Sequence, residues 1–223
     1  GNGVSLNKKV NNKSGMIIKY NSNGECEWAK GIGGSDDDSI RSVTETSDGG
    51  IIVGGDFSSS NIDLENGVIL SNKGNNDVMI IKYSSSGECE WAKGIGGSKS
   101  DYIESVAETS DGGIIAGGYF HSDSIDLGNG IILTNKNSSY SDGMIIKYSS
   151  SGECEWAQGI GGSRDDHINS VAESSDGGII VGGDFASSSI DLGNGVSLNK
   201  KVNNKSGMII KYNSSGECNW AKQ

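Results

Sequence analysis

Three aspartates recur at one position of a repeated motif and are the residues best placed to bind a ligand. Asp38, Asp101 and Asp166 each lie in a polar loop that follows a Gly-Gly-Ser segment. A ring of carboxylates on one face could bind Ca²⁺ or a polar ligand, because Ca²⁺ prefers oxygen ligands. An aspartate here could instead accept backbone hydrogen bonds and hold a turn. The turn role is favoured, since the nine-residue period of calcium-binding glycine-rich repeats is missing.

Further aspartates recur in two other motifs. One set lies in Ser-Asp-Gly-Gly segments, which are typical of tight turns and predict a structural role. The other set lies in Ile-Asp-Leu segments, where a turn or strand-edge role is favoured over ligand binding. The first set is Asp48, Asp111 and Asp176, and the second is Asp63, Asp126 and Asp191.

Four tryptophans recur in copies of Gly-Glu-Cys-Glu-Trp-Ala-Lys. Their rings could stack on sugars. They alternate with a cysteine on one face of an expected strand, however, which favours packing between neighbouring repeats. The four are Trp28, Trp91, Trp156 and Trp220.

Four cysteines also occupy one position of successive repeats. Equivalent sulfur atoms should therefore lie one repeat apart, beyond the Cα separation of roughly 7 Å that a disulfide can bridge. Buried free thiols are expected, with bridges between chains as the alternative. The spacing does not suit zinc, which requires two ligands a few residues apart. The cysteines are Cys26, Cys89, Cys154 and Cys218.

Residues that break the repeat could mark an enzyme. The histidines, His121 and His167, occupy unrelated positions and have no nucleophile partner in sequence, and the remaining singletons are Tyr102 and Tyr140. A catalytic triad needs a base that a third group orients. Gly-Ile-Gly-Gly-Ser lacks the Lys-Ser/Thr pair and the helix of a phosphate-binding loop. No catalytic residue, metal site or cofactor is predicted.

Composition narrows the possible partners. The 223 residues include 36 Gly and no Pro, and the net charge is −11. A nucleic-acid-binding protein would show a basic stripe, and a peripheral membrane protein a polybasic patch; neither is present. The longest apolar runs are about five residues, too short to insert into a membrane. Neither nucleic acid nor membrane is an expected partner.

The elements that carry these residues are short strands. Copies of Met-Ile-Ile-Lys-Tyr begin at residues 16, 79, 144 and 208, which gives steps of 63, 65 and 64 residues. Each is followed by a Ser/Asn-rich turn and by Cys-Glu-Trp-Ala-Lys, a pattern typical of a hairpin. Two further strands flank each Ser-Asp-Gly-Gly turn, and an Asn-Gly turn predicts a small hairpin in the connection to the next repeat. In the strand after the Ser-Asp-Gly-Gly turn, Gly54 and Gly55 suggest the close approach of a neighbouring sheet. The sequence thus predicts four main strands in each repeat of about 64 residues and no helix, since the glycine density is prohibitive.

The combined pattern resembles bacterial beta-propeller repeats of the SBBP (seven-bladed beta-propeller repeat) type and related surface-protein repeats. The matching motifs are MIIKY, WAK, GGS, SV, SDGG and IIVGG followed by Phe, and they cover nearly all of residues 15–221. The resemblance implies an all-β, propeller-like array of four-stranded blades. It implies a blade order from the Ser-Val strand at the inside to the Cys-Glu-Trp strand at the outside, and no enzymatic activity.

The chain is expected to form one repeat array, residues 1–223, of about three and a half blades. A half-blade at 1–35 precedes blades at about 38–98, 101–163 and 166–222. Residues 1–30 match residues 193–222 at 28 of 30 positions, an offset of three repeats. An open arc of three blades would expose apolar faces. We therefore expect closure by a homo-oligomer or by further copies of the repeat, with six blades from two blocks favoured over seven.

These observations predict a non-enzymatic structural or adhesive repeat module of a bacterial cell surface or extracellular assembly; the location rests on the resemblance alone. The alternative is a lectin-like propeller that binds a carbohydrate or another ligand, with a glycan as its partner. An enzyme would require a unique polar cluster that breaks the symmetry of the repeats, and the singletons His121, His167, Tyr102 and Tyr140 make no evident group.

Overall fold

The computed structural model describes residues 12–201 and 203–223, which form 20 β-strands and no helix. Twelve of the strands build three four-stranded antiparallel sheets, in each of which the four main strands of a repeat lie in chain order. The predicted fold class is therefore confirmed: the protein is all-β, with a four-stranded sheet in each repeat of about 64 residues.

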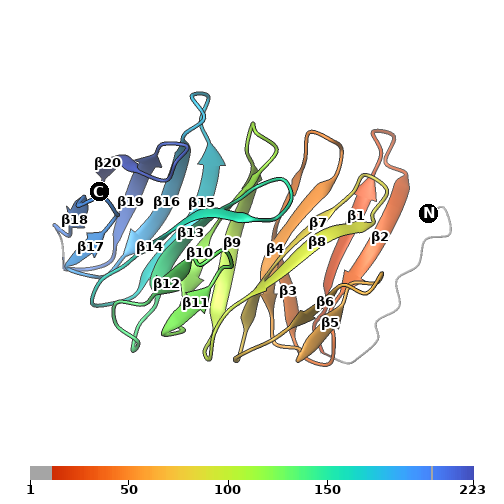
Figure 1. Ribbon diagram of the computed structural model, residues 1–223, viewed down its shortest axis with the longest axis horizontal. Coiled ribbons are helices and arrows are strands. Elements are labelled where there is room, and N and C mark those ends of the chain that lie inside the picture. Colours follow the sequence, from red (N-terminus) through yellow and green to blue (C-terminus); the bar gives the residue numbers. More distant parts are fainter. Residues whose placement is uncertain (1–11, 202) are drawn as a thin grey trace.

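The three sheets are named blades A, B and C and stand side by side in chain order (Figure 1). Blade A contains β3 (Asp38–Glu45), β4 (Ile51–Phe57), β7 (Asp77–Tyr83) and β8 (Cys89–Ile95). Blade B contains β9 (Asp101–Glu108), β10 (Ile114–Phe120), β13 (Asp142–Tyr148) and β14 (Cys154–Ile160). Blade C contains β15 (Asp166–Glu173), β16 (Ile179–Phe185), β19 (Ser206–Tyr212) and β20 (Cys218–Lys222).

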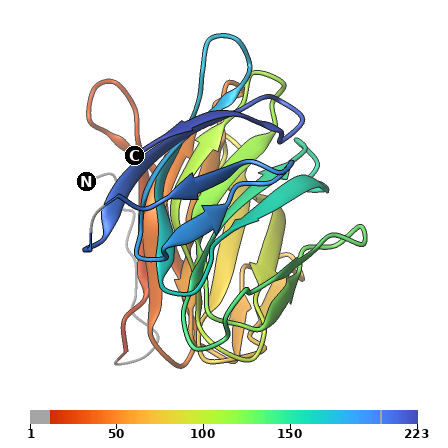
Figure 2. The ribbon, with the colours of Figure 1, turned by 90° about the vertical axis from the view of Figure 1, so that its left-hand side faces the viewer.

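A two-stranded half-blade precedes blade A. It consists of β1 (Gly15–Tyr20) and β2 (Cys26–Ile32), which pair with each other as the last two strands of each blade do. Figure 2 views the row from its C-terminal side and shows the sheets one behind another. The part of the prediction that falls on residues 1–11 lies outside the described residues.

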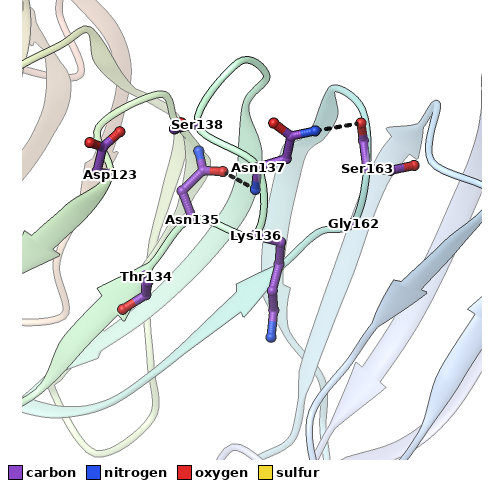
Figure 3. Close-up of a pocket in the computed structure, with 8 residues that line it drawn as sticks. All are labelled: Asp123, Thr134, Asn135, Lys136, Asn137, Ser138, Gly162 and Ser163. Atoms are coloured by element: carbon purple, nitrogen blue, oxygen red, sulfur yellow. Dashed lines mark hydrogen bonds between the residues drawn. The ribbon is translucent and has the colours of Figure 1, made fainter.

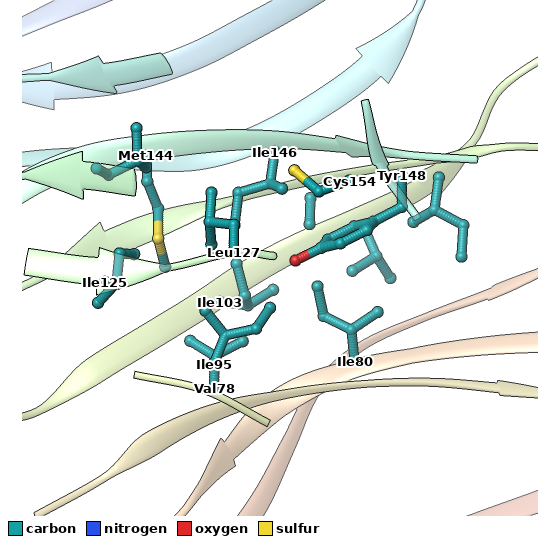
Figure 4. Close-up of a cluster of buried hydrophobic side chains, with 14 of the residues drawn as sticks. Val78, Ile80, Ile95, Ile103, Ile125, Leu127, Met144, Ile146, Tyr148 and Cys154 are labelled. Carbon is teal, nitrogen blue, oxygen red and sulfur yellow. The ribbon is translucent and has the colours of Figure 1, made fainter. Parts of the chain in front are cut away.

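Neighbouring sheets enclose one apolar cluster at each junction. Figure 4 shows the cluster between blades A and B, where Val78 and Ile80 of blade A face Met144 and Ile146 of blade B. Similar clusters lie between the half-blade and blade A and between blades B and C. Each fully buried aliphatic side chain stabilises the fold by roughly 1.5–3 kcal/mol. The junctions between sheets therefore hold the array together.

The first strand of each blade forms the inner edge of the row. β3 contacts β9, and β9 contacts β15. The strand order in each sheet then runs outward to β8, β14 and β20, the strands that contain the recurring tryptophan. This is the order that the resemblance implied.

The paired glycines of the second strand allow two close approaches of different kinds. A Cβ atom on Gly54 would lie 2.6 Å from Cγ1 of Val106 in blade B, so glycine there admits the neighbouring sheet. A side chain on Gly55 would instead meet the backbone of Ser39 in the same sheet, at the irregular register between β3 and β4. The predicted close approach of a neighbouring sheet is thus confirmed for Gly54 but not for Gly55.

The variable connections form the small hairpins predicted from Asn-Gly. Their strands are β5 (Asn61–Asp63) with β6 (Ile69–Ser71), β11 (Ser124–Asp126) with β12 (Ile132–Thr134), and β17 (Ser189–Asp191) with β18 (Ser197–Asn199). Three successive residues at each tip have positive φ. In the first hairpin one of them is Glu65, at φ 74°, where the later copies have glycine. The part of the chain that the structure describes contains no helix of the length and apolar character needed to cross a membrane.

Candidate functional site

The three loop aspartates lie at the start of the inner strands and are buried. The Asp38 carboxylate accepts hydrogen bonds from the backbone N–H of Gly34 at 2.8 Å and from the hydroxyl and backbone N–H of Ser59 at 2.7 and 3.2 Å. These contacts join the loop before β3 to the end of β4. The carboxylate therefore fastens the first two strands of blade A at one end.

The other two aspartates repeat this arrangement. Asp101 accepts from the hydroxyl of Ser122 at 2.7 Å and from the N–H of Gly97 at 3.0 Å. Asp166 accepts from the hydroxyl of Ser187 at 2.6 Å, and its burial raises its pKa. With their oxygens engaged inside the fold, these carboxylates have the geometry of the turn-holding role. The ligand-binding role predicted for Asp38, Asp101 and Asp166 stays a prediction that no observation tests.

The recurring tryptophans connect each sheet to the next. The indole N–H of Trp28 donates to the carbonyl of Ser85 at 2.9 Å, across the junction with blade A. The ring covers Gly87, where a Cβ atom would lie 2.9 Å from it, and its centroid is 6.2 Å from that of Tyr83. Glycine is needed at this turn for its positive φ and for the close approach of the ring. We call this arrangement the tryptophan clasp.

The clasp recurs at the two later junctions. Trp91 donates to the carbonyl of Ser150 at 3.0 Å, and Trp156 donates to that of Ser214 at 2.9 Å. The predicted packing of tryptophan between repeats is confirmed for these residues. Trp220 differs: 42% of its surface is exposed, and no neighbouring sheet lies beyond it among the described residues.

The second aspartate set holds the Ser-Asp-Gly-Gly turn of each blade and joins it to a lysine of the third strand. Lys147 is buried, and its amino group lies 3.0 Å from Asp111 and 3.1 Å from Glu155. The Thr109 hydroxyl and the Gly113 N–H also donate to Asp111, and with Lys147 they lower its pKa to about 2. Asp48 and Asp176 are placed in the same way in blades A and C. The structural role predicted for these turn aspartates agrees with their contacts.

The Ile-Asp-Leu aspartates hold the tips of the connection hairpins. Asp63 accepts from the backbone N–H of Glu65 at 2.9 Å, and Asp126 and Asp191 accept from the N–H of Gly128 and Gly193 in the same way.

The cysteine thiols are free, and only Cys154 is buried. The other three are half-buried, because the outer strands lie near solvent. Burial raises the pKa of Cys154 to about 11, so its thiol is protonated at neutral pH.

The residues that break the repeat come together, contrary to the sequence-based prediction that they form no group. Tyr102 of β9 faces Tyr119 of β10, with ring centroids 5.1 Å apart. His121 lies edge-on to both rings, and His167 of blade C lies 4.2 Å from Tyr119, centroid to centroid. All four side chains are half-buried. We call this the aromatic cluster; of the singletons, Tyr140 alone lies outside these ring contacts.

Polar groups of blades A and B lie beside the aromatic cluster. The guanidinium of Arg41 in blade A lies 5.2 Å from the Tyr102 ring centroid and 3.3 Å from Glu104. Asn76 donates to the Tyr102 hydroxyl at 2.9 Å. Blade B has Tyr102 opposite Tyr119. At the same positions blade A has Ser39 opposite Asp56, and blade C has His167 opposite Asp184. Sequence could reveal that these residues are unique but not that three strands bring them to one place.

One histidine has a hydroxyl neighbour that the sequence did not reveal. The Ser141 Oγ atom lies 2.9 Å from Nε2 of His167 and 3.0 Å from Asp165. Ser141 and His167 are thus neighbours in space, although 26 residues separate them in sequence. Ser141 is buried, however, and Asp165 contacts the serine rather than orienting the imidazole. Burial lowers the pKa of His167 and so favours its neutral ring.

A shallow polar pocket of about 620 Å³ lies beside the second connection hairpin (Figure 3). Its polar groups mostly satisfy one another: Asn137 donates its side-chain amide to the carbonyl of Ser163 at 3.2 Å and its backbone N–H to Asn135 at 2.8 Å. Within residues 12–201 and 203–223 no three histidine, cysteine or acidic side chains meet in a way that could hold a metal ion. The aromatic cluster is therefore the better candidate for a ligand site.

The comparisons with known proteins give little functional information. No protein-family model matches the chain. A similar curated protein is the regulatory protein FlaEY of Caulobacter vibrioides, 28% identical over 111 residues, which are 50% of this chain and 12% of the relative's length. A solved structure of a Bacteroides caccae protein of unknown function aligns with 92% of each chain at 10% identity, with a TM-score of 0.30.

Proposed function

We propose that this chain is a non-enzymatic structural repeat module of the bacterial SBBP propeller class, used at a cell surface or in an extracellular assembly. The observation that supports the proposal is that the recurring tryptophans and aspartates make contacts that stabilise the fold. Hydrogen bonds within the chain occupy the indole N–H groups of the tryptophans at the three junctions. They also occupy the carboxylates of the loop aspartates and of the turn aspartates. A scaffold needs repeated, self-supporting junctions of this kind.

A lectin-like role is the second candidate, and the aromatic cluster favours it. Half-buried rings lie beside Arg41 and Glu104, so partly exposed aromatic surface and charged hydrogen-bonding groups come together. Such a combination can stack on and orient a sugar ring. This differs from the pocket in every blade that the repeats suggested, because the cluster occurs once.

Two measurements test these roles. Antibodies raised against the chain should label intact cells of the bacterium that produces it; labelling that requires permeabilised cells would overturn the surface assignment. A glycan array probed with the labelled chain should give no binding if the module is purely structural. Binding that is lost on Tyr119→Ala but retained in Tyr140→Ala would establish the lectin-like role in its place.

A further inference from the structure

The two internal junctions between complete blades use the same three contacts at the inner edge. Between blades A and B, the N–H of Val106 donates to the hydroxyl of Ser42 at 3.1 Å, and the Val106 side chain fills the space beside Gly54. Near the strand end, Ser47 donates its N–H and hydroxyl to Glu108 at 2.8 and 3.0 Å.

The junction between blades B and C repeats each contact. The N–H of Val171 donates to Ser105 at 3.2 Å, and its side chain would lie 2.6 Å from a Cβ atom on Gly117. Ser110 donates its N–H and hydroxyl to Glu173 at 2.8 and 2.9 Å. A complete junction therefore needs a serine, a glycine and a second serine on one blade, and a valine and a glutamate on the next.

Blade C carries the first half of this contact set without a partner in the described chain. Ser170 and Ser175, the equivalents of Ser42 and Ser47, are exposed. Gly182, the equivalent of Gly54, has no atom of a neighbouring blade within 4 Å. Trp220 is exposed at the outer strand of the same face. This face therefore offers the serines, the glycine and the tryptophan of a junction.

Blade A carries the second half. Val43 is 55% exposed, whereas its equivalents Val106 and Val171 are 5% and 6% exposed. Glu45, the equivalent of Glu108, is exposed as well. A cleft of about 1130 Å³ lies between β3 and the half-blade, lined in part by Val43 and Met16. The half-blade covers the outer part of blade A and leaves its inner part open.

We propose that a second copy of the chain supplies the missing neighbour. Blade C of one copy packs on blade A of the next, places Gly182 against Val43 and Ser175 against Glu45, and takes the place of the half-blade. Trp220 then occupies the turn at Gly87 that Trp28 covers within the single chain. This proposal rests on the structural role above and specifies the partner and the surface.

The half-blade can give way because blade C reproduces its contacts. Residues 12–30 and 204–222 are identical except at two positions, Asn23/Ser215 and Glu27/Asn219. β1 pairs with β2 in the register that β19 and β20 use. The strands β1 and β2 pair with no strand of another sheet among the described residues. When the half-blade is displaced, blade A loses its outer contacts with β1 and β2, and β19 and β20 of the second copy restore them. The inner contacts of Val43 and Glu45 are gained in addition.

The association is head to tail, since different faces of the two copies meet. Such an interface either closes into a ring or extends as a filament. Light scattering on the purified chain should therefore give a mass of at least twice its 23.2 kDa, rising with concentration. A mass of one chain throughout the accessible concentration range would overturn the proposal.

Equivalent tryptophans should then have opposite effects on association. Trp220→Ala removes the clasp between copies and should weaken association by about tenfold or more. Trp28→Ala loosens the competing half-blade and should strengthen association. Trp91→Ala, inside the array, is the matched control and should alter stability without this pattern. Equal effects of Trp28→Ala and Trp220→Ala would contradict the displacement of the half-blade.

A second variant guards against misfolding as an explanation. Val43→Asp alters a side chain that is exposed in the single chain, so the variant should fold and unfold like the wild type. It would bury a carboxylate at the contact between copies and should abolish association. Assembly that survives Val43→Asp overturns the proposal. A monomeric chain that still labels at the cell surface and binds no glycan would leave the structural role standing and remove only the head-to-tail contact.

Discussion

Blade B is covered by a neighbouring sheet on both faces, whereas blade C has a neighbour on one face only within the described residues. The two blades have nearly the same strand sequences, yet equivalent positions differ in environment. Gly117 of blade B touches Val171, and Gly182 of blade C touches no other blade. The contribution of a residue to stability is therefore set by the sheet beside it as much as by its own strand.

The inner valines should show the largest difference. Val106→Asp places a carboxylate in the buried junction between blades A and B and should lower the free energy of unfolding by about 4 kcal/mol or more. Val43→Asp changes the exposed equivalent and should cost less than about 1 kcal/mol. Urea unfolding at concentrations where the chain is monomeric measures both. Similar losses from the two variants would show that Val43 is buried in solution.

The tryptophans should give the next largest difference. Trp91→Ala removes packing at the junction of blades A and B and leaves the carbonyl of Ser150 without its donor, a loss of about 3 kcal/mol. Trp220→Ala removes an exposed ring from the monomer and should cost about 1 kcal/mol or less. Thermal unfolding under dilute conditions compares them, and a larger loss from Trp220→Ala would contradict the open end of blade C.

Two buried carboxylates should make the protein more stable in mild acid. Burial raises the pKa of Asp77 and Asp142 to about 6, each has one oxygen without a hydrogen-bond partner, and blade C has Ser206 at this position. Because the folded-state pKa lies above the unfolded value, this stabilisation is full below the unfolded pKa and is lost as pH rises through about 6.

The expected gain is about 2 kcal/mol per carboxylate between about pH 7.5 and about pH 4.5. Urea unfolding across this range measures it. Asp77→Asn and Asp142→Asn should each remove one share of the dependence, while Ser206→Ala should leave it unchanged. A stability that falls steadily from pH 7.5 to 4.5 in the wild type would show that the two groups ionise normally.

The hairpin tips should give the smallest difference. Glu65 has a φ of 74°, which disfavours any residue except glycine, and its exposed ion pair with Lys30 contributes little. Glu65→Gly should therefore raise the free energy of unfolding by about 0.5–1 kcal/mol, and Gly128→Ala at the equivalent tip should lower it by about 1 kcal/mol. Differential scanning calorimetry of both variants checks the signs; a loss from Glu65→Gly would show that the ion pair outweighs the backbone strain.

Much of the fold could be predicted from the sequence because its signals are local and repeated. The spacing of Met16 and its copies predicted the repeat length, and the Ser-Asp-Gly-Gly turns marked the strand boundaries. The close approach at Gly54 also followed from the strand pattern. Gly55 could not be assigned in this way, because the irregular pairing beside Ile40 depends on how two strands meet.

The candidate site shows the opposite case. Tyr102 and His167 are 65 residues apart in sequence, and each alone indicates only a departure from the repeat. They are brought into one cluster through Tyr119 of β10, whose ring contacts both, because β10 packs against β9 and β15. A pattern of period two reports the face of a strand, but it contains no information about which strand of the next sheet that face will meet.

The sequence by itself determined the strands, their order within a repeat and the recurrence of one junction, since these follow from alternation, turn residues and copy number. The tertiary structure alone decided which copies of a repeated residue make contacts at a junction between sheets. Trp91 is clasped and Trp220 is exposed, although both stand in nearly the same seven-residue motif. The physical reason is that burial depends on a neighbouring sheet, and the residues of one repeat do not specify whether the next sheet is present.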